Sequence, residues 1–540
     1  MRKRFISLAL TALLGAGALM GCAGETEPGT PTQSVGEATE ATKDSLVVSV
    51  GTAAVDGNFD PTTGYGIYGY GLFHTALLTI NNDIQTEPDL ATEYTVSDDG
   101  LVYTFTVRDD VVFSDGEPLT PEDVVYTYET AKNSGSSVDL TVLDKAEVID
   151  GKVQFTLNKP FSPFVRTVAL LGIVPEHAHG DNYSQNPIGT GPLKLKQLDV
   201  DQQLIVEPNE HYYGQPTPFE QITFLAIDEE SALATAASGQ LDVVMINPEY
   251  ATETVEGMHL VALDTADNRG FNLPTVPETT NASGVTVGNN VTADPAIREA
   301  LNIGINRQEI IDNALNGIGE PSWVRFTGLP WANEEPGLTD GQVDEATALL
   351  EEAGWTDSDG DGVRENDGQR AEFRISGRSD DLMRYNLAVA FAENAKPLGI
   401  EITAESPDWT TAKEMVRHVP TGLGTGEYTF LDLYNAFHSD FAGPDIEGLN
   451  NTAMYSNPKV DEYIDAMLAA TTEEEAIEFA KHAQYDGETG VNVDFPYIWI
   501  ANIKHTYFVR DGLDLGEQKV HPHGHGVSVI QNVNEWSFEG

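Results

Sequence analysis

The chain has 540 residues, 40% of them hydrophobic and 21% charged, a length that suggests about three to four domain-sized units. Its 86 Asp and Glu residues outnumber 29 Lys and Arg residues, which gives a formal net charge of −57. Because such a field repels a phosphate backbone, we expect no nucleic-acid partner. Cys22 is the sole cysteine, so neither a disulfide framework nor a thiolate zinc site can form within the chain.

The first 44 residues read as an export signal and a tether. Arg2, Lys3 and Arg4 precede an apolar stretch that ends at Gly21 and Cys22. This pattern resembles a bacterial lipoprotein signal, so we predict a signal peptide over residues 1–21 and lipid attachment at Cys22. Residues 22–44 are rich in Thr, Glu, Gly and Pro and predict a flexible tether. An uncleaved anchor with an incidental cysteine is the alternative; either reading places the protein on the extracytoplasmic side of the cell membrane, in the periplasm or at the cell surface.

Alternating and helical hydrophobic patterns predict a mixed α/β chain. A strand is expected at residues 45–50, hairpins over 94–113, and a helix that begins at Thr120, where Thr120 and Pro121 are typical of a helix start. Further strands are expected at 193–198, 203–207, 222–226, 370–375, 400–404 and 428–435, with late β character over 497–509. Further helices are expected at 229–238, 296–315, 342–353, 382–397, 411–418, 459–470 and 472–484.

The order of these elements predicts two lobes with a ligand-binding cleft between them. An α/β lobe begins in mid-chain, and β character returns near the C-terminus. The chain should therefore cross between the lobes more than once, and clefts of this kind bind small molecules.

Several motifs carry a family resemblance. Residues 97–105 (SDDGLVYTF), 107–124 (VRDDVVFSDGEPLTPEDV), 187–192 (PIGTGP) and 207–213 (EPNEHYY) resemble the signature segments of extracytoplasmic solute-binding protein family 5, which serves ABC importers of peptides and nickel. The resemblance implies a two-lobed periplasmic-binding-protein-like α/β fold (class II, cluster C) with an extra subdomain inserted in lobe 1. The signature segments themselves predict hairpins and a capped helix, so they identify the fold and not the solute.

The resemblance also implies domain boundaries and partners. Lobe 1 would comprise residues 45–75, 188–285 and 505–540, the inserted subdomain 76–187, and lobe 2 residues 286–504. Such a protein captures a short peptide and delivers it to membrane permease subunits. We expect a monomer that is not an enzyme and needs no cofactor.

Asp440 is the candidate for binding a peptide's ammonium group. Phe437 and Asp440 fall where peptide-binding members of the family have an aromatic-x-x-Asp motif. A carboxylate there would form a charge-assisted hydrogen bond with the peptide terminus. A solvated loop aspartate is the alternative in so acidic a chain.

The segment from Gly64 to Gly69 matches G-x-G-x-x-G, but its tyrosines would crowd a pyrophosphate, so a dinucleotide site is rejected. Tyr65, Tyr68 and Tyr70 are instead candidate ligand contacts in the cleft, since tyrosine offers flat contact area with a polar tip. Packing of these tyrosines in the core is the alternative.

Two further motifs suggest metals. His521, His523 and His525 stand at alternate positions, which makes a nickel- or metallophore-binding protein of the same family the alternative function; a structural C-terminal loop is the competing interpretation. Asp357, Asp359 and Asp361 imitate the start of a calcium loop, but Gly368 occupies the twelfth position, so a tight acidic turn is expected.

Enzyme motifs are missing from the sequence. It has no G-x-S-x-G elbow, no H-E-x-x-H and no Walker A lysine. Peptide hydrolysis is the rival activity of a different class, and incubation of the protein with peptides would reveal it through cleaved products.

The lipid anchor can be tested with Cys22→Ser. Because this thiol is the only possible attachment point, the variant should be released from membranes or remain unprocessed. Membrane fractionation and the mass of the mature chain measure both effects. A processed variant that still sediments with membranes would disprove the anchor.

Overall fold

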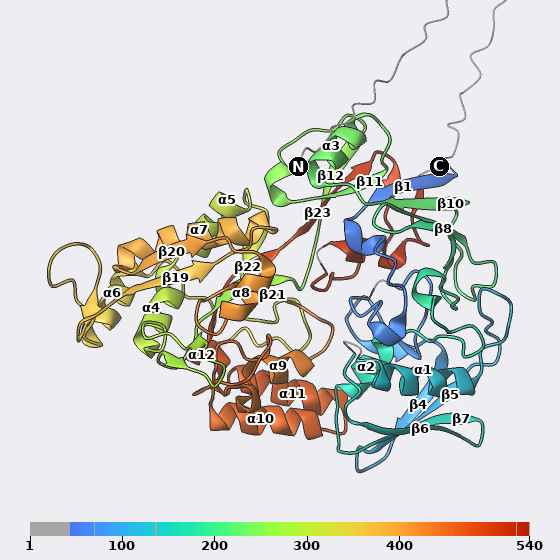
Figure 1. Ribbon diagram of the computed structural model, residues 1–540, viewed down its shortest axis with the longest axis horizontal. Helices are drawn as coiled ribbons and strands as arrows, with labels where there is room; N and C mark the ends of the chain where they lie inside the picture. The colour runs from blue at the N-terminus through green and yellow to red at the C-terminus, as the bar shows by residue number, and fades with distance from the viewer. Residues whose placement is uncertain (1–43, 70, 136–137, 525, 539–540) are drawn as a thin grey trace, which may run out of the picture. The chain divides into compact units, whose positions relative to one another are not determined.

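The computed structural model describes residues 44–538, apart from 70, 136–137 and 525 (Figure 1). The predicted signal peptide, Cys22 and the tether up to residue 43 lie outside the described residues. In the described part of the chain, no helix is both long and apolar enough to cross a bilayer.

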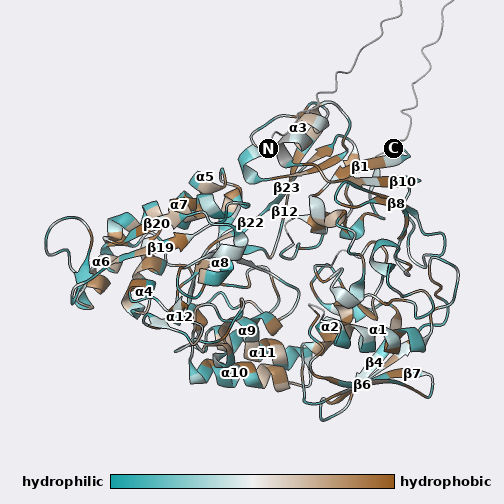
Figure 2. Cartoon of the chain, in the orientation of Figure 1, coloured by the Kyte–Doolittle hydropathy of each residue, from teal (hydrophilic) through white to brown (hydrophobic). Residues whose placement is uncertain are grey.

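A seven-stranded sheet forms the first lobe. Its strands follow the order β12-β23-β11-β1-β10-β9-β8, with β1 parallel to both β10 and β11. Their bounds are β1 Ser45–Ser49, β8 Leu193–Asp199, β9 Gln203–Pro208, β10 Gln221–Leu225, β11 Val243–Ile246, β12 Met258–Leu263 and β23 His505–Arg510. Helix α3, Glu229–Ala237, precedes β11. Figure 2 shows hydrophobic colours on β1 and β10, as expected for central strands.

A separate four-stranded antiparallel sheet forms the inserted subdomain. Its order is β4-β5-β7-β6, with bounds β4 Ala91–Val96, β5 Val102–Val107, β6 Leu143–Ile149 and β7 Lys152–Leu157. Helix α1, Pro121–Asn133, begins with a capping box in which Thr120 and Asp123 bond each other's backbone N–H groups. The helix start predicted at Thr120 is confirmed. Helix α2 spans Phe164–Leu170.

The second lobe combines two small sheets with most of the helices. The sheets are β16-β22-β13-β21 and the parallel pair β19-β20. The strands are β13 Asn268–Asn272, β16 Gly319–Pro321, β19 Glu372–Ser376, β20 Glu401–Glu405, β21 Gly422–Thr425 and β22 Tyr497–Ile503. The helices are α4 Pro295–Gly304, α5 Arg307–Ala314, α6 Val343–Glu352, α7 Leu382–Ala395, α8 Trp409–Met415, α9 Leu431–Phe437, α10 Pro458–Ala469, α11 Glu473–Gln484 and α12 Val491–Asp494.

Short two-stranded ribbons complete the structure. They are β2 Leu78–Ile80 with β3 Thr86–Pro88, β14 Thr279–Thr280 with β15 Thr286–Val287, β17 Glu365–Asn366 with β18 Gln369–Arg370, and β24 Leu513–Asp514 with β25 Ser537–Phe538. The sheets and helices together confirm the expected α/β class.

Two predicted elements differ from the structure. The helix expected over 296–315 is divided, because Ile305 is extended and the Asn306 side chain caps α5 by accepting from the Glu309 N–H. The strand expected over 428–435 is wrong. The strand ends at Thr425, and Leu431–Phe437 is helix α9. Leu431 and Leu433 alternate with polar residues and so imitate a strand, although both are buried on the helix.

The chain first crosses between the lobes earlier than predicted. Residues 268–272, which the expected boundary at 285 assigned to lobe 1, are strand β13 of the second-lobe sheet. The second crossing is at Lys504, between β22 and β23. Both crossings therefore join the seven-stranded sheet directly to the β16-β22-β13-β21 sheet.

Candidate functional site

The two crossings run side by side and a third segment lies against them. Leu263 pairs with His505 in the first-lobe sheet, and Asn268 pairs with Asn502 in the second-lobe sheet. The C-terminal segment joins through His521, whose carbonyl accepts from the Ala266 N–H at 2.8 Å. Three stretches far apart in sequence thus meet where the lobes join.

A cavity of about 410 Å³ lies beside these crossings, and both lobes line it. The first lobe contributes the ends of β1 and β11, including residues 50–53 and 245–248. The second lobe contributes Arg269 and residues 378 and 380–383, while residues 503–506 come from the second crossing. Its volume is in the range of small-molecule sites. We refer to it as the interlobe cavity.

Arg269 brings unsatisfied donors to the interlobe cavity. Its side chain is 4% exposed, and Nη2 donates to Asp267 Oδ2 at 2.7 Å. Nε and Nη1 are buried and have no hydrogen-bond partner among the described residues. Because buried unpaired donors are costly, these two N–H groups are suited to an anionic ligand group.

Asp267 forms an ion pair with Arg269. The carboxylate is fully buried and contacts Arg269, His523 Nδ1 at 3.0 Å and His505 Nε2 at 3.4 Å. Burial alone would raise the pKa of Asp267, but the neighbouring charges of Arg269 and His523 hold it well below its usual value. Asp267 therefore contacts one residue from the cavity wall, one from the second crossing and one from the C-terminal segment.

Two more arginines lie at this wall, each paired with an aspartate that lines the cavity: Arg378 with Asp380 and Arg384 with Asp381. Arg378 lines the cavity, pairs with Asp380 at 2.6 Å and lies 4.6 Å from the centre of the Trp409 ring. Arg384 lies behind it, where burial and the charge of Arg269 lower its pKa to about 9. This wall therefore carries arginines and aspartates together, and Arg269 is the one among them whose Nε and Nη1 have no partner in the described part of the chain.

Glu427 supplies a buried acid on the other side of Asp267. It directly follows strand β21, and its Oε2 accepts from the Gly426 N–H at 3.1 Å. Burial, and then the charge of Asp432, raise the pKa of Glu427. Burial and the charges of Glu427 and Asp267 also raise the pKa of Tyr68. Tyr68 is therefore close enough to both carboxylates to interact with them. Glu427 is thus an acid with a raised pKa beside Asp432, and it is not among the residues that line the interlobe cavity.

The structure places Asp440 away from the interlobe cavity. Its carboxylate is 60% exposed, accepts from the Tyr434 O–H at 3.0 Å and lies 3.3 Å from His438 Nδ1. Phe437 is 1% exposed and packs against Tyr497 in the core. Neither side chain lines the cavity.

Asp440 was proposed from the aromatic-x-x-Asp motif of the family resemblance. In the structure, strand β21 is followed directly by another acid, Glu427. Sequence reasoning missed Glu427, Arg269 and Asp267; the end of a Gly-rich strand, GLGT, was the one local signal that could have found Glu427.

The structure describes two of the three predicted tyrosines, and neither lines the interlobe cavity. Tyr65 is 8% exposed and packs on Phe59 and Phe73, although it also lines a second cavity of about 180 Å³. Tyr68 contacts the His523 ring edge-on with centroids 6.4 Å apart. Tyr70 lies outside the described residues, as do His525 and Cys22.

His521 and His523 are occupied by protein partners. His521 uses Nε2 with Gln518 at 3.0 Å and Nδ1 with His505 at 3.2 Å, so neither nitrogen is free for a metal. His523 uses Nδ1 with Asp267. His521 and His523 therefore form hydrogen bonds to residues of the protein, His521 with His505 and Gln518 and His523 with Asp267. We do not identify them as metal ligands.

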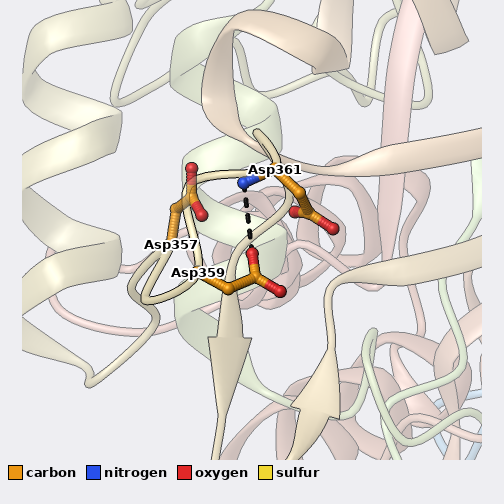
Figure 3. Close-up of side chains that lie close together, drawn as sticks. All are labelled: Asp357, Asp359 and Asp361. Atoms are coloured by element: carbon orange, nitrogen blue, oxygen red, sulfur yellow. Dashed lines mark hydrogen bonds between the residues drawn. The ribbon is translucent and has the colours of Figure 1, made fainter.

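Asp357, Asp359 and Asp361 come together in one exposed loop (Figure 3). The Asp359 carboxylate accepts from the Asp361 N–H at 3.1 Å, and Asp361 pairs with Arg370 at 2.9 Å. The Gly360 and Gly362 N–H groups donate to Asp357. These bonds describe the tight acidic turn that the sequence predicts.

Comparisons with known proteins agree with this architecture. A family model described as bacterial extracellular solute-binding proteins, family 5 Middle, matches residues 85–435. Protein XP55 of Streptomyces lividans is 33% identical over 519 residues, which cover 92% of this chain and 91% of that protein. The nickel-binding periplasmic protein of Escherichia coli K12 is 28% identical over 442 residues, 75% of this chain and 80% of that protein.

Solved structures share the fold. NikZ from Campylobacter jejuni in complex with Ni(L-His) is 24% identical with a TM-score of 0.74, covering 92% of this chain and 100% of that one. The oligopeptide-binding protein AppA from Bacillus subtilis in complex with a nonapeptide is 22% identical with a TM-score of 0.68, covering 92% of this chain and 99% of that one.

Gly424 provides a test of the packing around Arg269. A Cβ at this position would lie 2.5 Å from Arg269 Nη1 and 2.6 Å from His523 Cε1, whereas one at Gly422 would meet nothing closer than 3.3 Å. Gly424→Ala should therefore lower the free energy of unfolding by about 1–3 kcal/mol, and Gly422→Ala by clearly less. Chemical denaturation measures both. Equal losses would show that Arg269 and His523 are not tightly held.

Proposed function

Because the chain belongs to family 5 of the bacterial extracellular solute-binding proteins, we propose that it captures a short peptide in the interlobe cavity for an ABC importer. The family gives the coarse role, the solute-binding component of such an importer. The observation that carries the proposal is the pair of buried, unpartnered N–H groups of Arg269 in a cavity lined by both lobes.

Arg269 would bind the peptide's carboxylate. A carboxylate oxygen could accept from Nε or from Nη1, while Nη2 stays bonded to Asp267. Arg378 adds positive charge to the same wall without needing to leave Asp380. A free carboxylate is also the feature common to all linear peptides, so this contact would select the class and not the side chain.

Glu427 would bind the ammonium group. Its pKa is raised in the empty protein, and a cation beside it would remove the cost of keeping the acid ionised. Asp440 remains the alternative acid proposed from the family motif, and Tyr68 the proposed contact between the two ends. A ligand with both charges would thus complete the hydrogen bonding of Arg269 and favour the ionised form of Glu427.

We expect the two lobes to close on a bound ligand, because both of them line the cavity. Residues 50–53 and 245–248 belong to the first lobe, and Arg269 and Arg378 to the second. A ligand can contact both sets only when the lobes are together, so its binding would favour the closed state. Permease subunits would then distinguish loaded from empty protein by the distance between the lobes.

The ligands named for related structures support a peptide or a chelate. AppA of Bacillus subtilis was solved with a nonapeptide and NikZ with Ni(L-His). An arginine-rich wall could also receive the carboxylates of a metallophore, which keeps that alternative open. Lipid attachment at Cys22 and a tether up to residue 44 would hold the protein near its permease.

Paired variants and paired peptides test the assignment. Arg269→Gln should weaken binding of alanine tripeptide far more than binding of its C-terminal amide. Glu427→Gln should weaken binding of the tripeptide with a free amine far more than binding of its N-acetylated form. Removal of one partner from a buried charge pair costs about 2–5 kcal/mol, roughly 30-fold to several thousand-fold in affinity. Calorimetry measures the dissociation constants, with circular dichroism as a control for folding.

Asp440→Asn is the matched control. We expect it to bind both amine forms as the unaltered protein does, because its carboxylate is exposed. Selective loss in Asp440→Asn and none in Glu427→Gln would return the ammonium site to Asp440. Mass spectrometry of copurifying solutes provides an independent check: a metallophore, sugar or nickel in place of peptides would contradict the peptide ligand, and cleaved peptides would indicate a hydrolase.

A further inference from the structure

A continuous row of hydrogen-bonding side chains leads from the C-terminal region to Asp267. In order, its members are Trp536, Asn532, Gln518, His521, His505 and Asp267. The successive contacts are 3.0, 2.5, 3.0, 3.2 and 3.4 Å long. The row connects the first lobe to the carboxylate that holds Arg269.

The direction of the row is determined at its first member. The indole N–H of Trp536 can only donate, so Asn532 Oδ1 is an acceptor. Gln518 Nε2 donates to that same oxygen and to the Leu515 carbonyl, which leaves Gln518 Oε1 as the atom facing His521. Because this oxygen can only accept, His521 Nε2 must carry a hydrogen.

The other end of the row imposes the same condition. Asp267 is ionised, so its Oδ2 accepts and His505 Nε2 must also carry a hydrogen. Between them, the two Nδ1 atoms of His505 and His521 share one more hydrogen. Three N–H groups are therefore needed on four ring nitrogens, whereas two neutral imidazoles supply two.

We propose that His505 and His521 together carry one proton more than two neutral rings, and that this charge makes His505 a positioning residue for Asp267 and Arg269. The pair, and not either ring alone, is the charged unit, because the proton between the two Nδ1 atoms can be assigned to either. Its position next to Asp267 gives the pair an anionic partner within 3.4 Å.

The groups around the pair admit one charge and oppose a second. Asp267 attracts the proton, while Arg269 and His523 face His505 and Lys519 faces His521 as positive groups. Burial lowers the pKa of His505, and burial followed by the charge of His505 holds the pKa of His521 well below its usual value. The extra proton is therefore held by the hydrogen-bond acceptors at the two ends of the pair, Asp267 and Gln518. Lys504 is adjacent in sequence, but it pairs outward with Asp264 and Glu320, and the Tyr507 ring covers His521 edge-on.

The functional consequence rests on the proposed role of Arg269. With the pair charged, His505 donates to one Asp267 oxygen while Arg269 donates to the same carboxylate. When the pair loses its proton, two N–H groups serve three contacts, and because ionised Asp267 is the strongest acceptor, the contact that is lost is the one between the rings or the one to Gln518. His505 then loses its link to the C-terminal segment, and the side chain that positions Asp267 and Arg269 is held less firmly.

Nitrogen-15 NMR of the full chain with labelled histidine tests the charge without any ligand. At neutral pH we expect three N–H groups over the His505 and His521 rings, assigned through His505→Gln and His521→Gln. Gln518→Leu is the matched variant. It removes the acceptor that requires His521 Nε2–H, so two N–H groups suffice and the pair should become neutral. Two N–H groups in the unaltered protein, or no change in Gln518→Leu, would overturn the proposal.

Because burial lowers the pKa of both rings, calorimetry with alanine tripeptide from about pH 4 to pH 9 tests the positioning role. The affinity of the unaltered protein should fall roughly tenfold as the pair loses its charge. His505→Gln keeps an N–H donor toward Asp267 at every pH, so its profile should be flat with affinity retained. A pH-independent affinity in the unaltered protein, with a charged pair by NMR, would remove the positioning role. No tripeptide binding at any pH would instead count against the proposed function and leave the NMR result standing.

Discussion

One buried carboxylate, that of Asp267, determines how the parts of this protein meet. It lies on the first crossing between the lobes and is fully buried. A charge in such a place is costly unless every neighbouring group compensates it, and loss of one partner typically costs about 3–5 kcal/mol. Arg269, His505 and His523 must therefore stay around Asp267, and they come from the second lobe, the second crossing and the C-terminal segment.

This requirement links the join between the lobes to the ligand cavity. The guanidinium that neutralises Asp267 also belongs to a residue that lines the cavity, and its Nε and Nη1 have no partner among the described residues. A bound anion would complete the hydrogen bonding of Arg269, so ligand binding and the integrity of the crossings depend on the same few atoms.

The sequence predicted the elements that depend on neighbouring residues. The start of α1 at Thr120 and strand β1 were correct because caps and alternation are local signals. The α/β class and the family followed from continuous motifs. Leu431 and Leu433 show the limit of such signals, since their alternation is compatible with a strand and only packing makes the segment a helix.

The site itself depends on contacts that no local pattern contains. Asp267 and His505 are 238 positions apart, and His523 is 256 positions from Asp267. Neither Arg269 nor Asp267 belongs to a recognisable motif, so their pairing became visible only when β13 was placed beside β22. The three histidines near the C-terminus were noticed, but their spacing suggested a metal because their partners lie elsewhere in the chain.

A crystal structure of the protein with its copurified solute tests the central claim most directly. The account predicts an anionic group of the solute within hydrogen-bonding distance of Arg269 Nε or Nη1, with Asp267 still bonded to Nη2. A solute bound near Asp440, with both Arg269 nitrogens still unpartnered, would contradict it.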